Sequence, residues 1–151
     1  MSTHLLVRVG AAGWQRPAWR GPFYPDDMPD EWMLSYYNTQ YSAVYLPAAV
    51  WQGATAETWS QWLFDTRDDF HFVLEPGDPA VAPPAAERVF LADADWAAAY
   101  VWWLDDAPDL RTLSQRIARQ AASGEPLYVI SRSGDLGAMA AADTLRQVMG
   151  Y

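Results

Sequence analysis

Apolar runs of strand length recur along this chain, and between them apolar residues repeat at helical spacing. Residues 5–14 read as a buried strand entering an aromatic loop, because the apolar run ends in small residues and glycines. Further short apolar runs predict strands at 42–46, 70–74, 88–91 and 127–130. Strands that alternate with helices in this way indicate parallel βα units.

Polar capping residues precede several of the amphipathic segments. Asp30, Thr55 and Asp109 are each expected to cap a helix, because their side-chain oxygens accept from free backbone N–H groups in the first turn. The expected helices lie at 31–41, 56–64, 110–123 and 136–149. Residues 98–104 predict another strand, and the alternative is a helix from Asp95, since alanines are frequent there.

A proline-rich stretch interrupts the alternating pattern in the middle of the chain. Residues 76–86 contain prolines and a glycine at a spacing that neither a helix nor a central strand tolerates. The segment is therefore expected to be a loop or connection.

The composition limits the chemistry that is available. A chain of 151 residues forms one ordinary domain with a full core, and it contains no Cys. Disulfides, thiol nucleophiles and thiolate metal sites are therefore ruled out. With His4 and His71 as its two histidines, the sequence also predicts no multi-histidine metal site and no cofactor.

The charge is strongly acidic. Ten basic residues, all Arg, stand against nineteen acidic ones, which gives a net charge of −9 and argues against a nucleic-acid partner. The absence of Lys removes Schiff-base chemistry and the phosphate-binding lysine of P-loops. No run of about 18 apolar residues and no leader pattern occurs, so a cytoplasmic protein without a membrane contact is expected.

Three motifs near the amino terminus carry a family resemblance. They are the Gly10–Trp14 turn (Gly-x-x-Gly-Trp), the Trp-Arg-Gly of residues 19–21, and Phe-Tyr-Pro at 23–25. Together they resemble the YecE-like proteins, the domain of unknown function family numbered 72. The resemblance implies a TIM barrel of unsettled activity.

The resemblance covers two blocks, residues 7–74 and 100–149. The part between them is too short, because a TIM barrel takes roughly 250 residues. We therefore expect one domain over residues 1–151, in which the connection at 76–86 replaces the central barrel units. The expected fold is a truncated TIM-barrel-like α/β sheet of about five mainly parallel strands, with helices on the outer face and the last strand beside the first.

The chain departs from the family at the carboxyl ends of its strands, where barrel chemistry is built. Glu75 stands where the family carries a Lys, and Arg132 and Ser133 replace paired Asn residues. Tyr45 and the segment 47–51 replace an acidic residue, an Asn and a Phe-Tyr pair. Most polar groups of the family's site are thus missing.

Two carboxylates and two arginines remain as candidates for chemistry. Glu75 and Asp105 both follow strands and form the best acid/base pair, although such residues are more often solvated or cap helices. Arg20 and Arg132 have the shape to clamp an anion, and the alternative is an ion pair within the acidic surface. His71 alternates with two phenylalanines and is expected to be structural.

Aromatic residues in the loops offer a second kind of candidate. Trp14, Trp19, Tyr24 and Trp51 either form a platform for a sugar or base, or fill the space of the missing strands. The turn 131–135 either accepts a phosphate or serves as an ordinary helix cap at Asp135.

The expected function is that of an uncharacterised, non-catalytic YecE-like protein that acts by binding or self-association. An opened barrel exposes a sheet face and two edge strands, and this predicts a homodimer, with a small-molecule ligand as a further partner. The alternative is a hydrolase or other enzyme on a small polar or carbohydrate substrate, using Glu75 and Asp105 with Arg132 and the aromatic loop.

Overall fold

The computed structural model of the chain describes residues 5–151, and these contain one six-stranded parallel sheet and six α-helices. The strands follow the order β4-β3-β2-β1-β6-β5. Their bounds are β1 Val7–Ala12, β2 Ala43–Leu46, β3 His71–Leu74, β4 Val89–Leu91, β5 Val101–Leu104 and β6 Leu127–Ser131. The helices are η1 Pro17–Trp19, α1 Asp30–Gln40, α2 Ala48–Gln52, α3 Ala56–Phe64, α4 Ala94–Tyr100, α5 Leu110–Ser123 and α6 Leu136–Met149.

The last strand lies beside the first, as expected for a sheet of barrel type. β1 pairs with β6 in parallel over five residues, with Val9 opposite Val129. β4 and β5 are the two ends of the sheet and do not pair with each other, so the barrel is not closed. The truncated, parallel barrel-like fold is therefore confirmed, with one strand more than the five expected.

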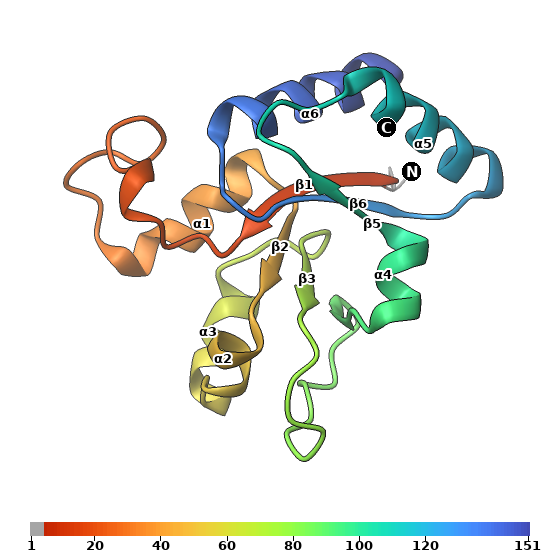
Figure 1. Ribbon diagram of the computed structural model, residues 1–151. Coiled ribbons are helices and arrows are strands. Elements are labelled where there is room, and N and C mark those ends of the chain that lie inside the picture. Colours follow the sequence, from red (N-terminus) through yellow and green to blue (C-terminus); the bar gives the residue numbers. More distant parts are fainter. Residues whose placement is uncertain (1–4) are drawn as a thin grey trace.

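The outer face of the sheet carries the larger core. Val9, Phe72 and Val129 on the strands pack with residues of α1, α3, α5 and α6 such as Tyr37 and Ile117, all of them buried. Figure 1 shows α5 and α6 stacked along one side of β1, β6 and β5. This layer is the helical coat that alternating βα units predict.

The inner face, which a complete barrel would bury against its opposite wall, is covered by a helix of the same chain. Trp96, Ala97 and Tyr100 of α4 pack against a second cluster that includes Tyr128 and Ile130. In Figure 1, α4 lies on the opposite side of β5 and β6 from α5 and α6. The expected strand over 98–104 is wrong at its start, because the chain is helical to residue 100 and extended only from Val101. The alanines favour a helix in this segment, and the helix places Trp96 against the apolar inner face of the sheet.

Helix starts follow the capping residues in most cases. Thr55, Asp109 and Asp135 each accept a hydrogen bond from a first-turn N–H group, as expected. Asp30 is instead the first residue of α1, and Pro29 precedes it as the cap. The short helix α2, which follows Pro47, was not among the expected helices.

The proline-rich connection has a fixed place. Residues 75–88 contain no helix or strand, and the Gln52 side chain exchanges two hydrogen bonds with the backbone of Asp78, at 3.1 and 3.2 Å. A Cβ on Gly77 would lie 2.6 Å from the Gln52 amide, so glycine lets the backbone lie flat on that amide. Within residues 5–151, no helix is long and apolar enough to cross a membrane.

Candidate functional site

The carboxyl ends of the strands are the first place to look for a site, because parallel sheets of this kind bind ligands there. Glu75 follows β3, but one of its carboxylate oxygens accepts a hydrogen bond from the Ala48 N–H at 2.9 Å. That N–H belongs to the first residue of α2, so Glu75 acts as a cap for this helix from outside it. The structural alternative considered for this carboxylate is thus realised at Glu75.

Arg132 lies over an aromatic ring next to β6. Its guanidinium carbon is 3.8 Å from the centre of the Trp103 ring, and Trp103 meets Tyr45 edge-on at 5.1 Å. Burial and the Glu75 charge raise the pKa of Tyr45, and Arg132 acts in the opposite direction. Glu75, Tyr45, Trp103 and Arg132 therefore share one corner of the inner face, and Trp103 occupies its centre.

Asp105 is exposed after β5, and none of its atoms takes part in a hydrogen bond within the described chain. Its neighbour Asp106 accepts instead from the Ser133 hydroxyl. Five well-formed hollows in residues 5–151 are lined by residues other than Glu75, Asp105 and Arg132. The structure brings Glu75 and Arg132 near one tyrosine but does not arrange an open acid/base pair.

The turn after β6 is held by side chains of the same chain. Asp135 caps α6 through the Ala138 N–H at 2.8 Å, which puts a negative charge where an anion would bind. Arg16 donates to the Ser133 and Arg132 carbonyls at 2.7 and 2.8 Å, and a Cβ on Gly134 would meet its guanidinium at 2.6 Å. Ordinary capping therefore accounts for this segment.

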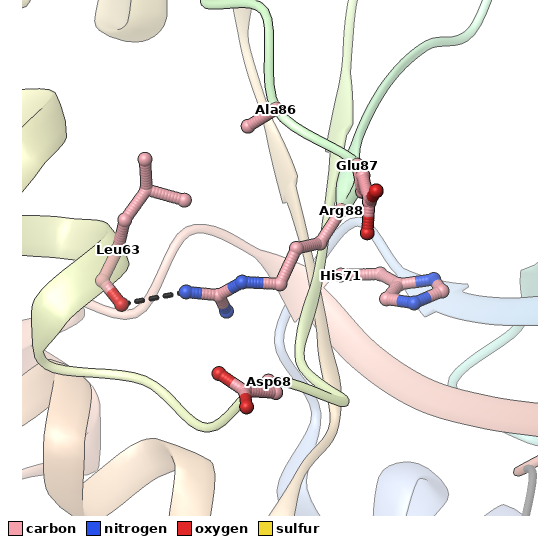
Figure 2. Close-up of a pocket in the computed structure, with 6 residues that line it drawn as sticks. All are labelled: Leu63, Asp68, His71, Ala86, Glu87 and Arg88. Atoms are coloured by element: carbon pink, nitrogen blue, oxygen red, sulfur yellow. Dashed lines mark hydrogen bonds between the residues drawn. The ribbon is translucent and has the colours of Figure 1, made fainter.

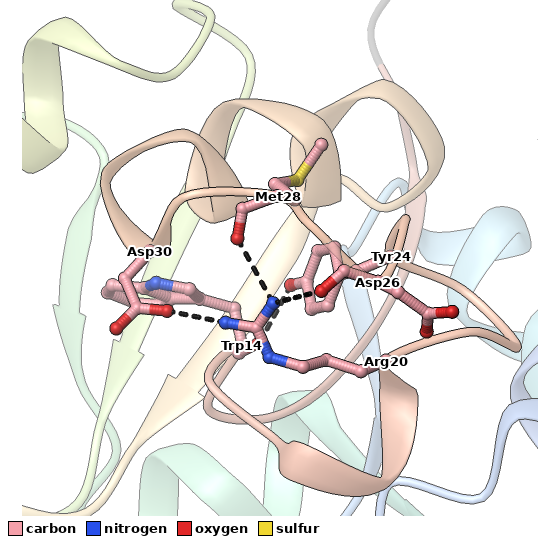
Figure 3. Close-up of polar contacts among 6 residues, drawn as sticks. All are labelled: Trp14, Arg20, Tyr24, Asp26, Met28 and Asp30. Carbon is pink, nitrogen blue, oxygen red and sulfur yellow. Dashed lines mark hydrogen bonds and ion pairs between the residues drawn. The ribbon is translucent and has the colours of Figure 1, made fainter.

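Arg20 is engaged in an ion pair beside the first loop. One terminal nitrogen binds the Asp30 carboxylate at 2.7 Å, and the other donates to the carbonyls of Asp26 and Met28. Figure 3 shows these contacts converging on the guanidinium. The ion-pair alternative accounts for this arginine.

The aromatic candidates lie largely inside the protein. Trp14, Trp19, Tyr24 and Trp51 are all buried within their own chain. The Trp51 indole N–H donates to the Glu75 carbonyl and the Trp19 indole N–H to the Gly134 carbonyl, both at 2.8 Å. The rings fill space and tie loops to the sheet, which agrees with the second of their two expected roles.

An additional aromatic residue, Trp62 on α3, lines two hollows near the carboxyl ends of β1 and β2. Trp14 and Trp62 meet edge-on at 5.1 Å, and both line two adjoining hollows of about 220 and 400 Å³. In the sequence, Trp62 lies on one apolar stripe of this helix with Trp59 and Leu63. The signal that distinguishes it is its position three residues after the buried Trp59, at the edge of that stripe, where a large ring stays half-exposed.

A larger hollow, of about 480 Å³, opens at the opposite, amino-terminal edge of the sheet (Figure 2). His71 lines it, and its Nδ1 atom is 2.7 Å from the Tyr128 hydroxyl. Burial, with the charges of Arg8 and Arg88, lowers the pKa of His71 to about 4. Arg88 is itself bound to the carbonyl of Leu63 at 2.6 Å, so both basic groups of this hollow hold the structure together.

No group of three or more His, Asp or Glu side chains among residues 5–151 is arranged to hold a metal ion. At the carboxyl end of the open parallel sheet, Glu75 and Arg132 are held by contacts within the chain, and hollows lie beside the Trp14–Trp62 pair. These features define an α/β protein of open-barrel type.

The sequence supplies the family. Residues 8–76 match the profile described as "Protein of unknown function DUF72", and this part of the chain belongs to the DUF72 family. The solved structure of a DUF72 family protein from Thermotoga maritima is similar, with a TM-score of 0.64 at 12% identity, over 97% of this chain and 100% of that one. This likeness concerns the fold. A comparison with curated proteins gives no match.

Proposed function

We propose that this chain is a non-catalytic DUF72 protein that acts by binding, and that a second copy of itself is one of its partners. The main evidence that the chain is not catalytic is the hydrogen bond that the Glu75 carboxylate accepts. Its carboxylate already caps α2, at 2.9 Å from the Ala48 N–H, on the end of the sheet where a barrel enzyme would hold its reacting groups.

Arg132 supports the same conclusion. Its guanidinium rests on Trp103, and the ring takes the space between Arg132 and Tyr45 in which a substrate would have to lie. The enzyme alternative needs Glu75 and Asp105 to face one open hollow, and the five hollows described above are lined by other residues.

The free edge at β4 supports self-association. Two hydrogen bonds join the ends of β4 to β3: the Phe72 N–H donates to the Arg88 carbonyl, and the Ala92 N–H donates to the Leu74 carbonyl. Because backbone groups along a strand point alternately to either side, those of Leu91, one residue before Ala92, face away from β3. The Leu91 side chain is 41% exposed, whereas both tryptophans of the other edge strand, β5, are half-buried. An exposed apolar residue on an unpaired edge favours strand pairing with a second chain.

Symmetry and charge set the conditions for this pairing. A twofold axis at β4 would place the same strand of two copies side by side and antiparallel. The net charge of −9 on each copy opposes the contact at low salt, so association is expected to strengthen as salt is added.

Light scattering over a concentration series, at low and moderate salt, tests the proposal. The wild type is expected to form a dimer at micromolar concentration in moderate salt. Leu91→Lys places a charge on the edge and is expected to give a monomer, whereas Val148→Lys is expected to leave the dimer intact, because it changes an 80% exposed residue on α6.

A wild type that stays monomeric, or a Leu91→Lys variant that still dimerises, would overturn the self-association. The non-catalytic part has a separate test. Turnover of small glycosides or esters by the wild type, lost on Glu75→Gln and on Asp105→Asn, would reverse that conclusion in favour of the enzyme.

A further inference from the structure

We infer that the two hollows around the Trp14–Trp62 pair form one binding groove for a small amphipathic amine, with the apolar body in one hollow and the ammonium group in the other. This site involves α1, α2, α3, the ends of β1 and β2, and the loop after β1. It does not depend on self-association at β4.

The two hollows adjoin, because they share three lining residues. Trp14, Gln15 and Trp62 line both the 220 Å³ hollow and the 400 Å³ hollow. The two indole rings meet at 88°, with their centres 5.1 Å apart. A ligand that passes along this pair would touch both hollows.

The smaller hollow is apolar and lies at the ends of two strands. Besides the shared residues, its lining consists of Ala12, Gly13, Leu46, Pro47 and Val50. Gly13 turns the chain after β1 with a φ of +84°, a conformation that residues with a side chain rarely adopt. An apolar cavity of about 150 Å³ accepts a benzene ring, so about 220 Å³ is enough for one aromatic or short aliphatic group.

The larger hollow has the opposite character. Three carboxylates line it, those of Asp30, Glu31 and Asp65, and no arginine does. The Asp30 carboxylate forms an ion pair with Arg20, and the Asp65 carboxylate accepts a hydrogen bond from the Gln61 amide at 2.7 Å. The Glu31 carboxylate has no hydrogen bond or ion pair within the described chain. Figure 3 shows the Asp30 carboxylate bound to the Arg20 guanidinium.

Charge and aromatic surface together favour a cation over an anion in the larger hollow. An ammonium group near Glu31 and Asp65 gains from the carboxylates and from the negative face of an indole ring. An acid or a phosphate would be repelled by the same carboxylates and by the net charge of −9. An apolar hollow beside an anionic one therefore favours a molecule that has both an apolar body and a positive charge.

The inference is tested with 2-phenylethylamine as the probe and 2-phenylethanol as its neutral counterpart. Titration followed by NMR of the tryptophan indole signals is expected to move those of Trp14 and Trp62 with the amine, with at least a severalfold weaker response to the alcohol. Added salt is expected to weaken the binding of the amine. Equal binding of the alcohol would identify a neutral-ring site and overturn the amine assignment.

Two matched variants separate the carboxylate's role from a general effect of charge. Glu31→Gln is expected to weaken amine binding about two- to fivefold, the range of an exposed ion pair. Glu57→Gln is the control, because Glu57 is also an exposed acidic residue in the first turn of a helix but does not line the groove.

Val50→Lys is a third variant, aimed at the apolar hollow, and it is expected to abolish binding. Unchanged melting temperatures would establish that all three variants are folded. Indole signals that do not respond to the amine, or equal affinities for Glu31→Gln and Glu57→Gln, would overturn the inference.

Discussion

The hydroxyl of Tyr24 donates a hydrogen bond of 2.7 Å to the backbone carbonyl of Trp14. The tyrosine is fully buried, and burial raises its pKa well above the ordinary value. This bond closes the first loop on itself, because it joins two residues that are ten positions apart in the sequence. Without it, the Trp14 carbonyl would have no protein donor within the described chain. Figure 3 shows the Tyr24 hydroxyl directed towards Trp14.

Tyr24→Phe is therefore expected to lower the free energy of unfolding by about 1–2 kcal/mol, because it leaves a buried carbonyl unpaired while keeping the ring. Denaturant unfolding provides the measurement. Tyr36→Phe is the control, since the Tyr36 ring packs on Phe23 and Tyr24 without a hydrogen bond from its hydroxyl in the described chain. Equal losses for the two variants would contradict this role of the hydroxyl.

A second tyrosine hydroxyl bridges two strands from a helix. Tyr37 of α1 donates to the Ala43 carbonyl at 2.6 Å and accepts from the Ala11 N–H at 2.9 Å. Tyr37→Phe leaves two buried backbone groups unpaired and is expected to cost about 2 kcal/mol or more in denaturant melts. Tyr41→Phe, on the same helix, is expected to cost less, and the reverse order would contradict the bridge.

The same bridge explains Gly10. A Cβ at this position would lie 2.0 Å from the Ala43 carbonyl oxygen and 2.9 Å from the Tyr37 hydroxyl. Gly10→Ala is expected to destabilise the protein by about 1–3 kcal/mol or to prevent folding, because the obstacle is backbone. A stability equal to that of the wild type would mean that β1 and β2 separate easily.

His71 gives the stability a pH dependence with a defined sign. The pKa of His71 is lowered to about 4 in the native state, whereas an unfolded chain has an ordinary value near 6.5. The unfolded state thus binds the proton first, and stability falls as the pH is lowered from about 6.5 to 4. In His71→Gln this part of the loss is expected to vanish in unfolding curves recorded at several pH values. Parallel losses in variant and wild type would show that carboxylates alone account for it.

Glu75 is expected to behave as a helix cap. Glu75→Ala removes the acceptor for the Ala48 N–H and is expected to cost about 1 kcal/mol in thermal or denaturant unfolding. Glu75→Gln keeps an oxygen acceptor and is expected to cost only a few tenths. Identical costs for the two changes would mean that the hydrogen bond contributes nothing.

Local signals in the sequence were sufficient for most elements. The strand after Leu5, the helix stop at Gly124 and the cap at Asp135 depend on contacts within a few residues, and the structure confirms them. The segment 94–104 could not be assigned in this way. Its helix–strand junction at Val101 is decided by Trp96 packing on Tyr128, a residue far away along the chain.

For the candidate site too, the sequence indicated positions along the chain but not the contacts that the residues make. Residue type and position indicated that Glu75, Arg20 and Arg132 belong to strand ends and loops, but not which partners they meet. Ala48, Asp30 and Trp103 are those partners. The cap at Glu75 and the ion pair at Arg20 were weighed without a named partner, whereas the contact of Arg132 with an aromatic ring was not among the alternatives. The role of Trp62 beside Trp14 needed the packing of α3 against the first loop.

The sequence by itself determined the parallel βα plan, the family and the break at residues 76–86, because periodicity, motif spacing and proline act on neighbouring residues. Only the tertiary structure decided that α4 covers the open inner face, that Glu75 accepts a hydrogen bond from the first turn of α2, and that two hollows meet at Trp14. These outcomes depend on which side chains occupy a shared volume. That is a property of packing between distant segments, and local preference does not encode it.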